Sequence, residues 1–370
     1  MKNLFSKFIS CVGIFVVGAA TVTMTAFAPP AKAVDFSGKT IQAFVAFSAG
    51  GGGTYYTRLY LPFFKKYLPG NPTIIVRNMP GGGGLIGSNW FQANAKPDGL
   101  FYSVISTSNM SSMVMGDEKV KYNLLEWESI IMEPLGTIFY TTPKTGVTGK
   151  NISKDVATLR NTQIVTGAKT PTSSELHLFL AFDMLGINKI TPVFGIGSGA
   201  QRKAVLRGEF NMKRDSAINY LKKVASYAKK GKVVPWMTLG YEQDGKIVRD
   251  PYFPNLPTII DAYKAMNGGK APSGVGFDSF KHFFHMAVTA SKGFALPPKT
   301  PKAIVDVYVA AAKKIEKDKG FAKRAGKLYG VYPKAYGKDA NDVMRAAVDV
   351  PPQNKKYIRD FVKRKFNMTM

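Results

Sequence analysis

Two runs of four consecutive glycines constrain the fold of this chain more than any other feature of its sequence. The runs are Gly50–Gly53 and Gly81–Gly84. Each follows an apolar segment of strand character, at 40–47 and 73–76, and each precedes a segment of helical character. Glycine lets backbone N–H groups approach a ligand closely, and a helix N-terminus adds partial positive charge. Two such loops at neighbouring strand ends predict one anion site at the edge of an α/β sheet.

Strand and helix signals alternate along the first part of the chain. The elements expected there are strands at 40–47, 73–76 and 101–105 and helices at about 55–67 and 85–94, with turn signals at 68–72 and 97–99. An order of strand, helix, strand, helix, strand predicts a parallel sheet with right-handed crossovers.

A second α/β unit is expected after Pro143. Its elements are expected to be strands at 162–166, 190–194 and 233–238 and helices at 175–185 and 201–207. The C-terminal part is expected to be helical, with one helix starting near Thr300 and Pro301 and a last helix at about 354–365.

Neither glycine run has the pattern of a nucleotide-binding loop. A P-loop requires Lys-Ser or Lys-Thr directly after the glycines, and both runs lack it. A dinucleotide-binding fold requires an acidic residue near the end of the second strand, where this chain has Val76, Arg77 and Asn78. Ordinary tight turns remain the alternative for either run taken alone.

The first 33 residues have the layout of a secretory signal peptide. Lys2 and Lys7 precede an apolar run at Val12–Val17, and Ala31–Ala33 has small residues at both key positions before a cleavage point. We expect cleavage near Ala33, with an uncleaved membrane anchor as the alternative. The single cysteine, Cys11, lies inside this segment, so disulfides are not expected in the mature chain.

The size of the mature chain indicates two domains, and its charge bears on the kind of partner that it binds. Removal of 33 of the 370 residues leaves 337, which suggests two domains. The net charge of +27 falls to +24 when Lys2, Lys7 and Lys32 are removed. Such a field attracts anionic solutes, although a solvated surface with many lysines is an equal alternative. The lysines are scattered, so no nucleic-acid partner is expected.

Several short stretches carry a resemblance to a known family. They are Phe47–Thr54, Asn78–Gly87, Pro97–Gly99, Thr166–Leu176, Gly197–Ala200, Arg207–Glu209 and Leu256–Thr258. In these stretches the chain resembles the substrate-binding receptors of tripartite tricarboxylate transporters, also called Bug-type periplasmic solute-binding proteins. The resemblance covers nearly the whole mature chain.

The resemblance implies an α/β, two-domain periplasmic binding protein of the Venus-flytrap type, in which each domain is a mostly parallel sheet flanked by helices. The implied domains are 34–140 with 255–370, and 141–254. The implied function is capture of a small carboxylate in the cleft between the domains and its delivery to integral-membrane permease subunits. The family implies no cofactor, no metal and no catalysis, and we expect a monomer in the periplasm. A carboxylate-sensing domain for a signalling partner is the alternative function.

The resemblance also implies a set of ligand-binding residues. The two glycine loops would hold one carboxylate, and the second domain would add further contacts. The implied residues are Phe47, Ser48, Ala49, Gly50, Gly51, Gly52, Gly53, Thr54, Gly81, Gly82, Gly83, Gly84, Thr166, Gly167, Ser173, Ser174, Gly197, Ser198 and Asp215, with Asn109 after the third strand as a further polar contact.

One departure from the family bears on the ligand. The family usually has Thr-Asp where this chain has Gly53 and Thr54. Threonine still caps a helix, but a ligand amine would lose its aspartate partner, which favours a purely anionic ligand. Contacts from four further side chains are left open: Arg202, Arg214, Tyr55 and Tyr56.

Other chemistry has weaker support in the sequence. His282 and His285 lack a third ligand nearby for a metal, and Met110, Met113 and Met115 are better explained by packing. Ser173 and Ser174 lie close to His177, but a serine one turn before a histidine on one helix does not reproduce a catalytic triad.

Overall fold

The computed structural model describes residues 33–326 and 330–368. The predicted signal peptide up to residue 32, with Cys11, lies outside these ranges. From Val34 onwards the chain folds as one unit. Among the helices of the described ranges, none combines the length and the apolar composition needed to span a bilayer.

A six-stranded sheet carries the predicted glycine loops. Its strands are β1 (Thr40–Val45), β2 (Thr73–Asn78), β3 (Phe101–Ser106), β4 (Glu128–Glu133), β12 (Lys292–Leu296) and β13 (Ala335–Tyr336). They are arranged in the order β13-β4-β12-β3-β1-β2. β1 pairs in parallel with β2 and with β3, as the alternation of strands and helices predicts. β12 runs antiparallel to both β3 and β4.

The sheet is therefore mixed, whereas a mostly parallel one was expected. The β-α-β rule applies only where one strand follows another through a helical crossover, and this holds for β1 to β3. β12 comes from a distant part of the chain, so nothing in the local alternation sets its direction.

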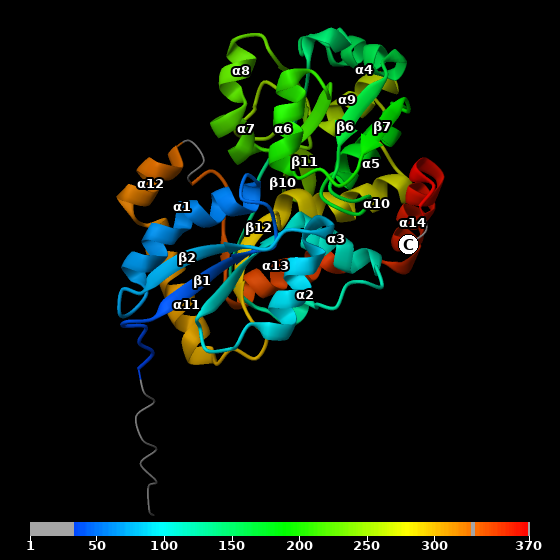
Figure 1. Ribbon diagram of the computed structural model, residues 1–370. Helices are drawn as coiled ribbons and strands as arrows, with labels where there is room; N and C mark the ends of the chain where they lie inside the picture. The colour runs from blue at the N-terminus through cyan, green and yellow to red at the C-terminus, as the bar shows by residue number, and fades with distance from the viewer. Residues whose placement is uncertain (1–32, 327–329, 369–370) are drawn as a thin grey trace, which may run out of the picture. The chain divides into compact units, whose positions relative to one another are not determined.

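Side chains on both faces of β1 are buried, as expected for a central strand. Ile41, Ala43 and Val45 join the apolar cluster on one face, and Phe44 joins the cluster on the other. The first face is covered by α1 (Gly52–Tyr67), α11 (Lys302–Glu316) and α12 (Lys319–Ala325). The other face is covered by α2 (Leu85–Asn94), α3 (Thr107–Met115) and α13 (Lys338–Val348), as Figure 1 shows.

A second group of strands lies in the upper half of Figure 1. β5 (Thr137–Thr141), β8 (Met212–Ser216) and β9 (Val234–Thr238) form an antiparallel sheet in the order β8-β5-β9, and β6 (Ile164–Gly167) pairs in parallel with β7 (Ile190–Val193). Asn211 links the two sheets: its N–H donates to the Val165 carbonyl at 3.0 Å, and its side-chain oxygen accepts from the Val165 N–H at 2.9 Å. The helices of this group are α4 (Ile152–Asn161), α5 (Leu176–Met184), α6 (Ser198–Arg207), α7 (Ala217–Lys223), α8 (Ala225–Lys229) and α9 (Ile259–Met266).

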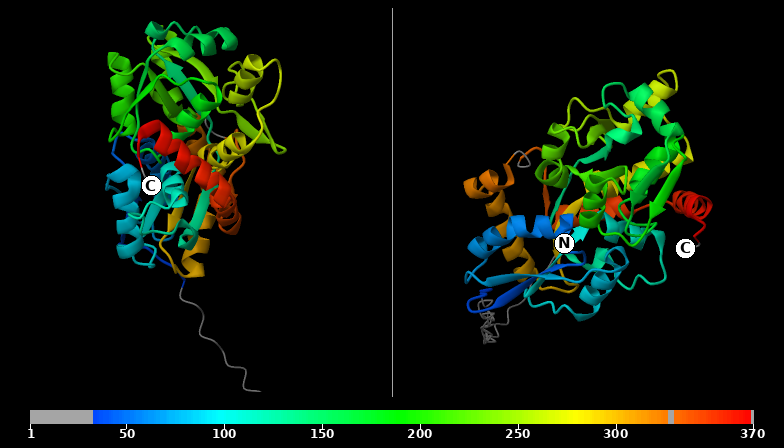
Figure 2. Two further views of the ribbon diagram at one scale, coloured as in Figure 1. Left: turned by 90° about the vertical axis from the view of Figure 1, so that its right-hand side faces the viewer. Right: turned by 45° about the horizontal axis from the view of Figure 1, so that its top comes forward.

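The chain passes between the two groups of strands at several places. Pro134–Gly136 joins β4 to β5. The return runs through α10 (Val275–Phe284) and the π-helix η4 (His285–Thr289) into β12. α14 (Pro352–Phe366) packs on α10 and α3, as the views of Figure 2 also show.

The segments beside the two predicted domain boundaries pack with the second group. β5, just before the predicted boundary at residue 140, pairs with β8, and α9, just after the one at residue 255, packs on α4. The domain boundaries remain predictions. The remaining short elements are the hairpin of β10 (Tyr241–Gln243) and β11 (Lys246–Val248) and the turns η1 (Gly82–Gly84), η2 (Leu124–Glu126) and η3 (Pro143–Thr145).

Phe294 on β12 provides a test of this packing. Its ring is fully buried and lies 4.8–5.6 Å, between centroids, from those of Tyr56, Tyr60, Phe64 and Tyr102. Because Phe294→Ala leaves a cavity among these rings, we expect it to lower the free energy of unfolding by about 3–5 kcal/mol in urea denaturation.

Ile75 on β2 gives the control for this variant. Its side chain is 49% exposed, so Ile75→Ala should change the free energy of unfolding by no more than about 0.5 kcal/mol. Equal effects of the two substitutions would show that β12 is not part of the core.

Candidate functional site

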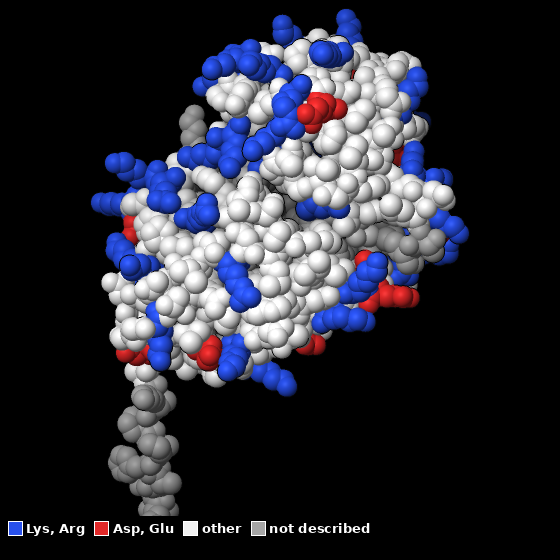
Figure 3. All heavy atoms as spheres, in the orientation of Figure 1, with Lys and Arg blue, Asp and Glu red and all other residues white. Residues whose placement is uncertain are grey.

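A cavity of about 370 Å³ lies at the carboxyl ends of β1, β2 and β3. Figure 3 shows a hollow near the N-terminal end of α1, on a face where Lys and Arg side chains greatly outnumber Asp and Glu. The first segments of the wall directly follow the three strands: Ala46–Ser48 with Gly51–Gly53, Pro80–Gly84, and Ser106–Ser108. The rest of the wall comes from the second group of strands and from β12, namely Lys169, Ser174, Gly195, Gly197, Ser198, Arg214, Asp215, Ser216, Asn219, Ser291 and Lys292. This is the edge at which open α/β sheets bind ligands.

The first glycine loop leads directly into α1. Gly51 occupies the N-cap position, no side chain caps the helix, and its first turn contains no acidic residue. The N–H groups of the first turn have no partner within a helix, and here the partial positive charge of the helix end is uncompensated at the cavity wall. The loop therefore offers hydrogen-bond donors and positive potential to an anion.

The second glycine loop has a backbone that only glycine adopts readily. The φ angles of Gly81, Gly82, Gly83 and Gly84 are +144°, +54°, +71° and +109°. Residues with a Cβ atom are strained in this region. Four consecutive glycines are thus explained by the path of the chain around the cavity and into α2.

Two predicted site residues support the segments that form the wall and do not line the cavity themselves. The Thr54 hydroxyl donates to the Ser48 carbonyl at 3.1 Å and accepts from the Asn78 amide at 2.7 Å. Asn109 caps α3, because its side-chain oxygen accepts from the Ser106 N–H at 3.0 Å. Both side chains therefore fix the conformation of backbone segments that form the wall.

Asp215 lines the cavity from β8, but its carboxylate is already engaged. Arg202 Nη1 donates to its two oxygens at 3.1 and 3.2 Å, and the Tyr140 hydroxyl donates at 3.3 Å. The other guanidinium nitrogen, Arg202 Nη2, donates to the Gly50 carbonyl at 2.8 Å. Arg202 therefore connects Asp215 to the first glycine loop and does not itself line the cavity.

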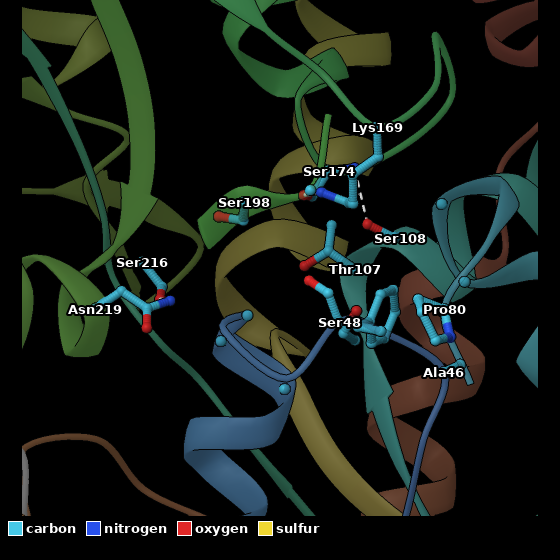
Figure 4. Close-up of a pocket in the computed structure, with 18 of the residues that line it drawn as sticks. Ala46, Ser48, Pro80, Thr107, Ser108, Lys169, Ser174, Ser198, Ser216 and Asn219 are labelled. Atoms are coloured by element: carbon cyan, nitrogen blue, oxygen red, sulfur yellow. Dashed lines mark hydrogen bonds between the residues drawn. The ribbon is translucent and has the colours of Figure 1, made fainter. Parts of the chain in front are cut away.

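A second, partly buried ion pair joins Lys169 to Glu175. The Lys169 ammonium lies 2.7 Å from each Glu175 oxygen and 2.9 Å from the Ser174 hydroxyl, and Ser173 donates to Glu175 at 2.7 Å. Burial favours the neutral form of Glu175, but the charges of Lys169 and Lys213 hold its pKa far below the usual range. Figure 4 shows Lys169 and Ser174 beside Ser108, whose hydroxyl accepts from the Ser174 N–H at 3.1 Å.

Three more cations are buried around this wall. Burial lowers the pKa of Lys213 to about 8, of Lys292 to about 7, and of Arg214 below its usual value. The Lys213 ammonium donates to the Gln201 side chain at 2.6 Å, and Arg214 Nη2 donates to the Thr137 hydroxyl at 3.2 Å. This side of the cavity is therefore strongly electropositive.

The structure brings many of the predicted binding residues together. Those on the cavity wall are Phe47, Ser48, Gly51, Gly52, Gly53, Gly81, Gly82, Gly83, Gly84, Ser174, Gly197, Ser198 and Asp215. Those away from it are Ala49, Gly50, Thr54, Asn109, Thr166, Gly167 and Ser173. Tyr56 lies in the aromatic core, and Tyr55 is half-buried with its ring near Lys223. That the predicted residues on the wall contact a ligand remains a prediction.

Sequence reasoning missed part of the wall. The missed residues are Ala46, Pro80, Ser106, Thr107, Ser108, Lys169, Gly195, Ser216, Asn219, Ser291 and Lys292. For Arg214, which also lines the wall, the sequence does not decide whether it contacts the ligand. Ser106–Ser108 directly follow the third strand, so the strand-end rule that selected Asn109 could have found them. Lys292 carries no such signal because it enters on an antiparallel strand.

His177 does not form a catalytic pair with the neighbouring serines Ser173 and Ser174. His177 places its Nδ1 against the Ser174 carbonyl at 2.9 Å and its Nε2 against the Phe283 carbonyl, so neither nitrogen contacts a serine hydroxyl. Within 33–326 and 330–368, no three His, Cys, Asp or Glu side chains lie close enough to hold a metal ion.

The fold is that of known periplasmic solute-binding proteins. MatC from Rhodopseudomonas palustris with bound malate is similar with a TM-score of 0.64 and 20% identity, over 87% of this chain and 98% of MatC. The periplasmic binding protein BugD gives 0.65 and 19%, over 90% and 99%. Rpa4515 from R. palustris with adipate gives 0.67 and 15%, over 90% and 99%. No protein-family model matches the chain, and no curated protein matches it in sequence.

Asp215→Asn tests the buried pair at the cavity wall. The side chains of Arg202 and Asp215 are 6% and 2% exposed. Removing the carboxylate charge leaves Arg202 buried without its counterion, so we expect the free energy of unfolding to fall by about 3–5 kcal/mol in urea denaturation.

Glu209→Gln is the matched control. Glu209 pairs with Arg207, and these side chains are 54% and 58% exposed. Solvent screens this pair, so the variant should unfold like the parent protein. If Asp215→Asn were equally harmless, the Arg202–Asp215 pair would not stabilise the fold.

Proposed function

We propose that the chain is an extracytoplasmic solute-binding receptor of the tripartite tricarboxylate transporter type, which captures a small carboxylate and delivers it to membrane permease subunits. The observation that carries the proposal is the convergence of two glycine loops, each leading into a helix N-terminus, on one cavity. The similar fold of periplasmic binding proteins, two of them with bound malate and adipate, supports it.

The proposed ligand carboxylate binds at the glycine loops. Its oxygens accept hydrogen bonds from backbone N–H groups of Gly52, Gly53 and Gly81–Gly83, and the end of α1 stabilises its charge. The N–H groups of Gly51 and Gly84 already donate to the Ser48 and Gly81 carbonyls, at 2.9 and 3.0 Å. Hydrogen bonds to a charged acceptor are shorter and stronger than neutral ones. Ser48, Ser198 and Asn219 lie on the same wall, as Figure 4 shows, and can orient the ligand.

The contacts that join the two sides of the proposed clamp in this structure would stabilise its closed state. Arg202 Nη2 reaches the Gly50 carbonyl at 2.8 Å, and the Ser174 N–H reaches the Ser108 hydroxyl at 3.1 Å. A Cβ atom on Gly199 would lie 3.0 Å from the Gly50 oxygen, so the backbones approach closely here. Opening would break these contacts, and a ligand that bridges both sides would favour the closed state.

We propose that the clamp divides near the predicted boundaries and bends where strands of the two groups are joined. Pro134–Gly136, between β4 and β5, is the first such place. The closed form would be the state that the permease recognises, and the +24 charge of the mature chain would favour encounter with anions.

Gly51→Leu tests the carboxylate site. Gly51 is buried on the cavity wall with a φ angle of −80° that leucine can adopt, but its Cβ would lie 3.0 Å from the Ser48 carbonyl oxygen. Leucine therefore displaces the loop that is proposed to hold the carboxylate. We expect a thermal-shift screen of the mature chain against carboxylates to find a stabilising ligand, worth about 2.7 kcal/mol at 100 times its Kd. Gly51→Leu should abolish the shift.

Ala49→Leu is the control in the same loop. Ala49 is exposed, lies off the wall and already carries a Cβ atom. This variant should keep most of the shift. A screen in which no carboxylate stabilises the parent protein, or in which both variants respond equally well, would falsify the proposed site.

A further inference from the structure

Three cationic side chains from separate elements line the cavity beside the glycine loops. Lys169 lies in the loop between β6 and α5, Arg214 on β8 and Lys292 on β12. We call these three residues the cationic wall. Lys292 and Arg214 are each only 9% exposed, although they border the cavity.

The members of the cationic wall differ in how they are paired. Lys169 is neutralised by Glu175 at 2.7 Å. Arg214 makes one hydrogen bond, from Nη2 to Thr137, and its Nε is buried with no partner. The Lys292 ammonium has no hydrogen bond or ion pair with any described residue. Since buried charges in proteins are normally paired, Lys292 and Arg214 have unused capacity to bind an anion.

The acidic groups that face Lys292 do not supply this anion. Glu133 is its ladder partner on β4, but the two side chains form no ion pair, and Glu133 instead lies 3.9 Å from Lys334. Asp215 on β8 is held by Arg202. The other charges near Lys292 are its two fellow cations of the cationic wall. The excess of positive charge at this point is thus not compensated by the protein.

The cationic wall is close enough to the glycine loops for one small ligand to reach both. Lys292 pairs with Ser106 at the carboxyl end of β3, which is the edge where the glycine loops begin. In the strand order β12-β3-β1-β2, β12 is two strands from β1, and neighbouring strands are about 4.8 Å apart. A ligand with one acid group at the glycine loops can therefore bring a second acid group, about 10 Å along the edge or less, to Lys292.

We propose that Lys292 and Arg214 form a second anion subsite, so that the bound solute is a small dicarboxylate whose distal carboxylate binds between them. This inference rests on the proposed function, since the proximal carboxylate is assigned to the glycine loops. Lys169, already paired with Glu175, adds positive potential and is not a direct ligand. The subsite discriminates against monocarboxylates because they leave the two buried cations without a partner.

Titration calorimetry with pairs of acids of equal carbon number tests the subsite. The pairs are succinate with butyrate and adipate with hexanoate, each measured on the parent protein and on Lys292→Met. Methionine keeps the length of the side chain and removes the charge. We expect the parent protein to bind the better dicarboxylate at least about tenfold more tightly than its monocarboxylate partner, as for a hydrogen bond to a charged group. Lys292→Met should lose this preference and keep its monocarboxylate affinity.

Two further variants complete the design. Lys292→Arg restores the charge and should recover most of the preference. Lys302→Met removes an exposed lysine of α11 that pairs with Asp306, and it should bind like the parent protein. The melting temperature of Lys292→Met should not fall, because the variant lacks an unpaired buried charge, so lost binding will not reflect unfolding.

The outcomes separate this inference from the proposed function. If butyrate or hexanoate binds as tightly as its dicarboxylate partner, or if Lys292→Met keeps the preference, the second subsite is refuted and the carboxylate receptor stands. If no acid of either kind binds, the receptor proposal fails and the subsite fails with it.

The pH dependence of affinity gives an independent test. Burial, with the charges of Arg214 and Lys169, lowers the pKa of Lys292 to about 7 in the free protein, and a bound carboxylate raises it. Dicarboxylate affinity is therefore full below pH 7 and falls as the pH rises through the free-state pKa towards about pH 9. Lys213, whose pKa is about 8, also titrates in this range, but it donates to Gln201 and is unchanged in every variant, so its effect on affinity is common to all of them. Lys292→Met and the monocarboxylates should lack the additional fall, and a dicarboxylate affinity that is equal at both ends of this range contradicts the subsite.

Discussion

The parallel pairing of β1 with β2 on one side and with β3 on the other places three loops side by side at one edge of the sheet. All parallel strands end at the same edge, so the two glycine loops and Ser106–Ser108 necessarily meet there. The helices that follow the loops point their N-terminal ends at the same space. The anion site proposed for the cavity thus rests on backbone geometry before any charged side chain is considered.

Charged side chains from the second group of strands and from β12 help to form the rest of the cavity wall. The cations Arg202, Lys213, Arg214 and Lys292 are buried around it and Lys169 is partly buried, against the buried acids Glu175 and Asp215. Such an arrangement costs stability, because desolvated charges need partners. Two ion pairs and the bond from Lys213 to Gln201 offset part of this cost. The uncompensated part is placed at the cavity, where an anionic solute can compensate it.

Arg202 shows how the two sides of the molecule are coupled. Its guanidinium group binds Asp215 on β8 and the Gly50 carbonyl of the first glycine loop. A movement of one side relative to the other therefore changes both the ion pair and the loop that is proposed to hold the solute. In this way one side chain would link closure of the proposed clamp to the shape of the proposed carboxylate site.

The sequence by itself determined the parts of the site that depend on local backbone conformation. The glycine runs predicted loops of special backbone conformation at the strand ends, and Gly81–Gly84 indeed have four positive φ angles. The alternation of strands and helices predicted that β1, β2 and β3 run parallel. Only the tertiary structure decided that Lys292 and Arg214 border the same cavity, that Asp215 is taken by Arg202, and that Thr54 and Asn109 support the wall without lining it. The physical reason is that direction, burial and pairing of a side chain depend on strands that meet from distant parts of the chain, and no local pattern encodes which of them become neighbours.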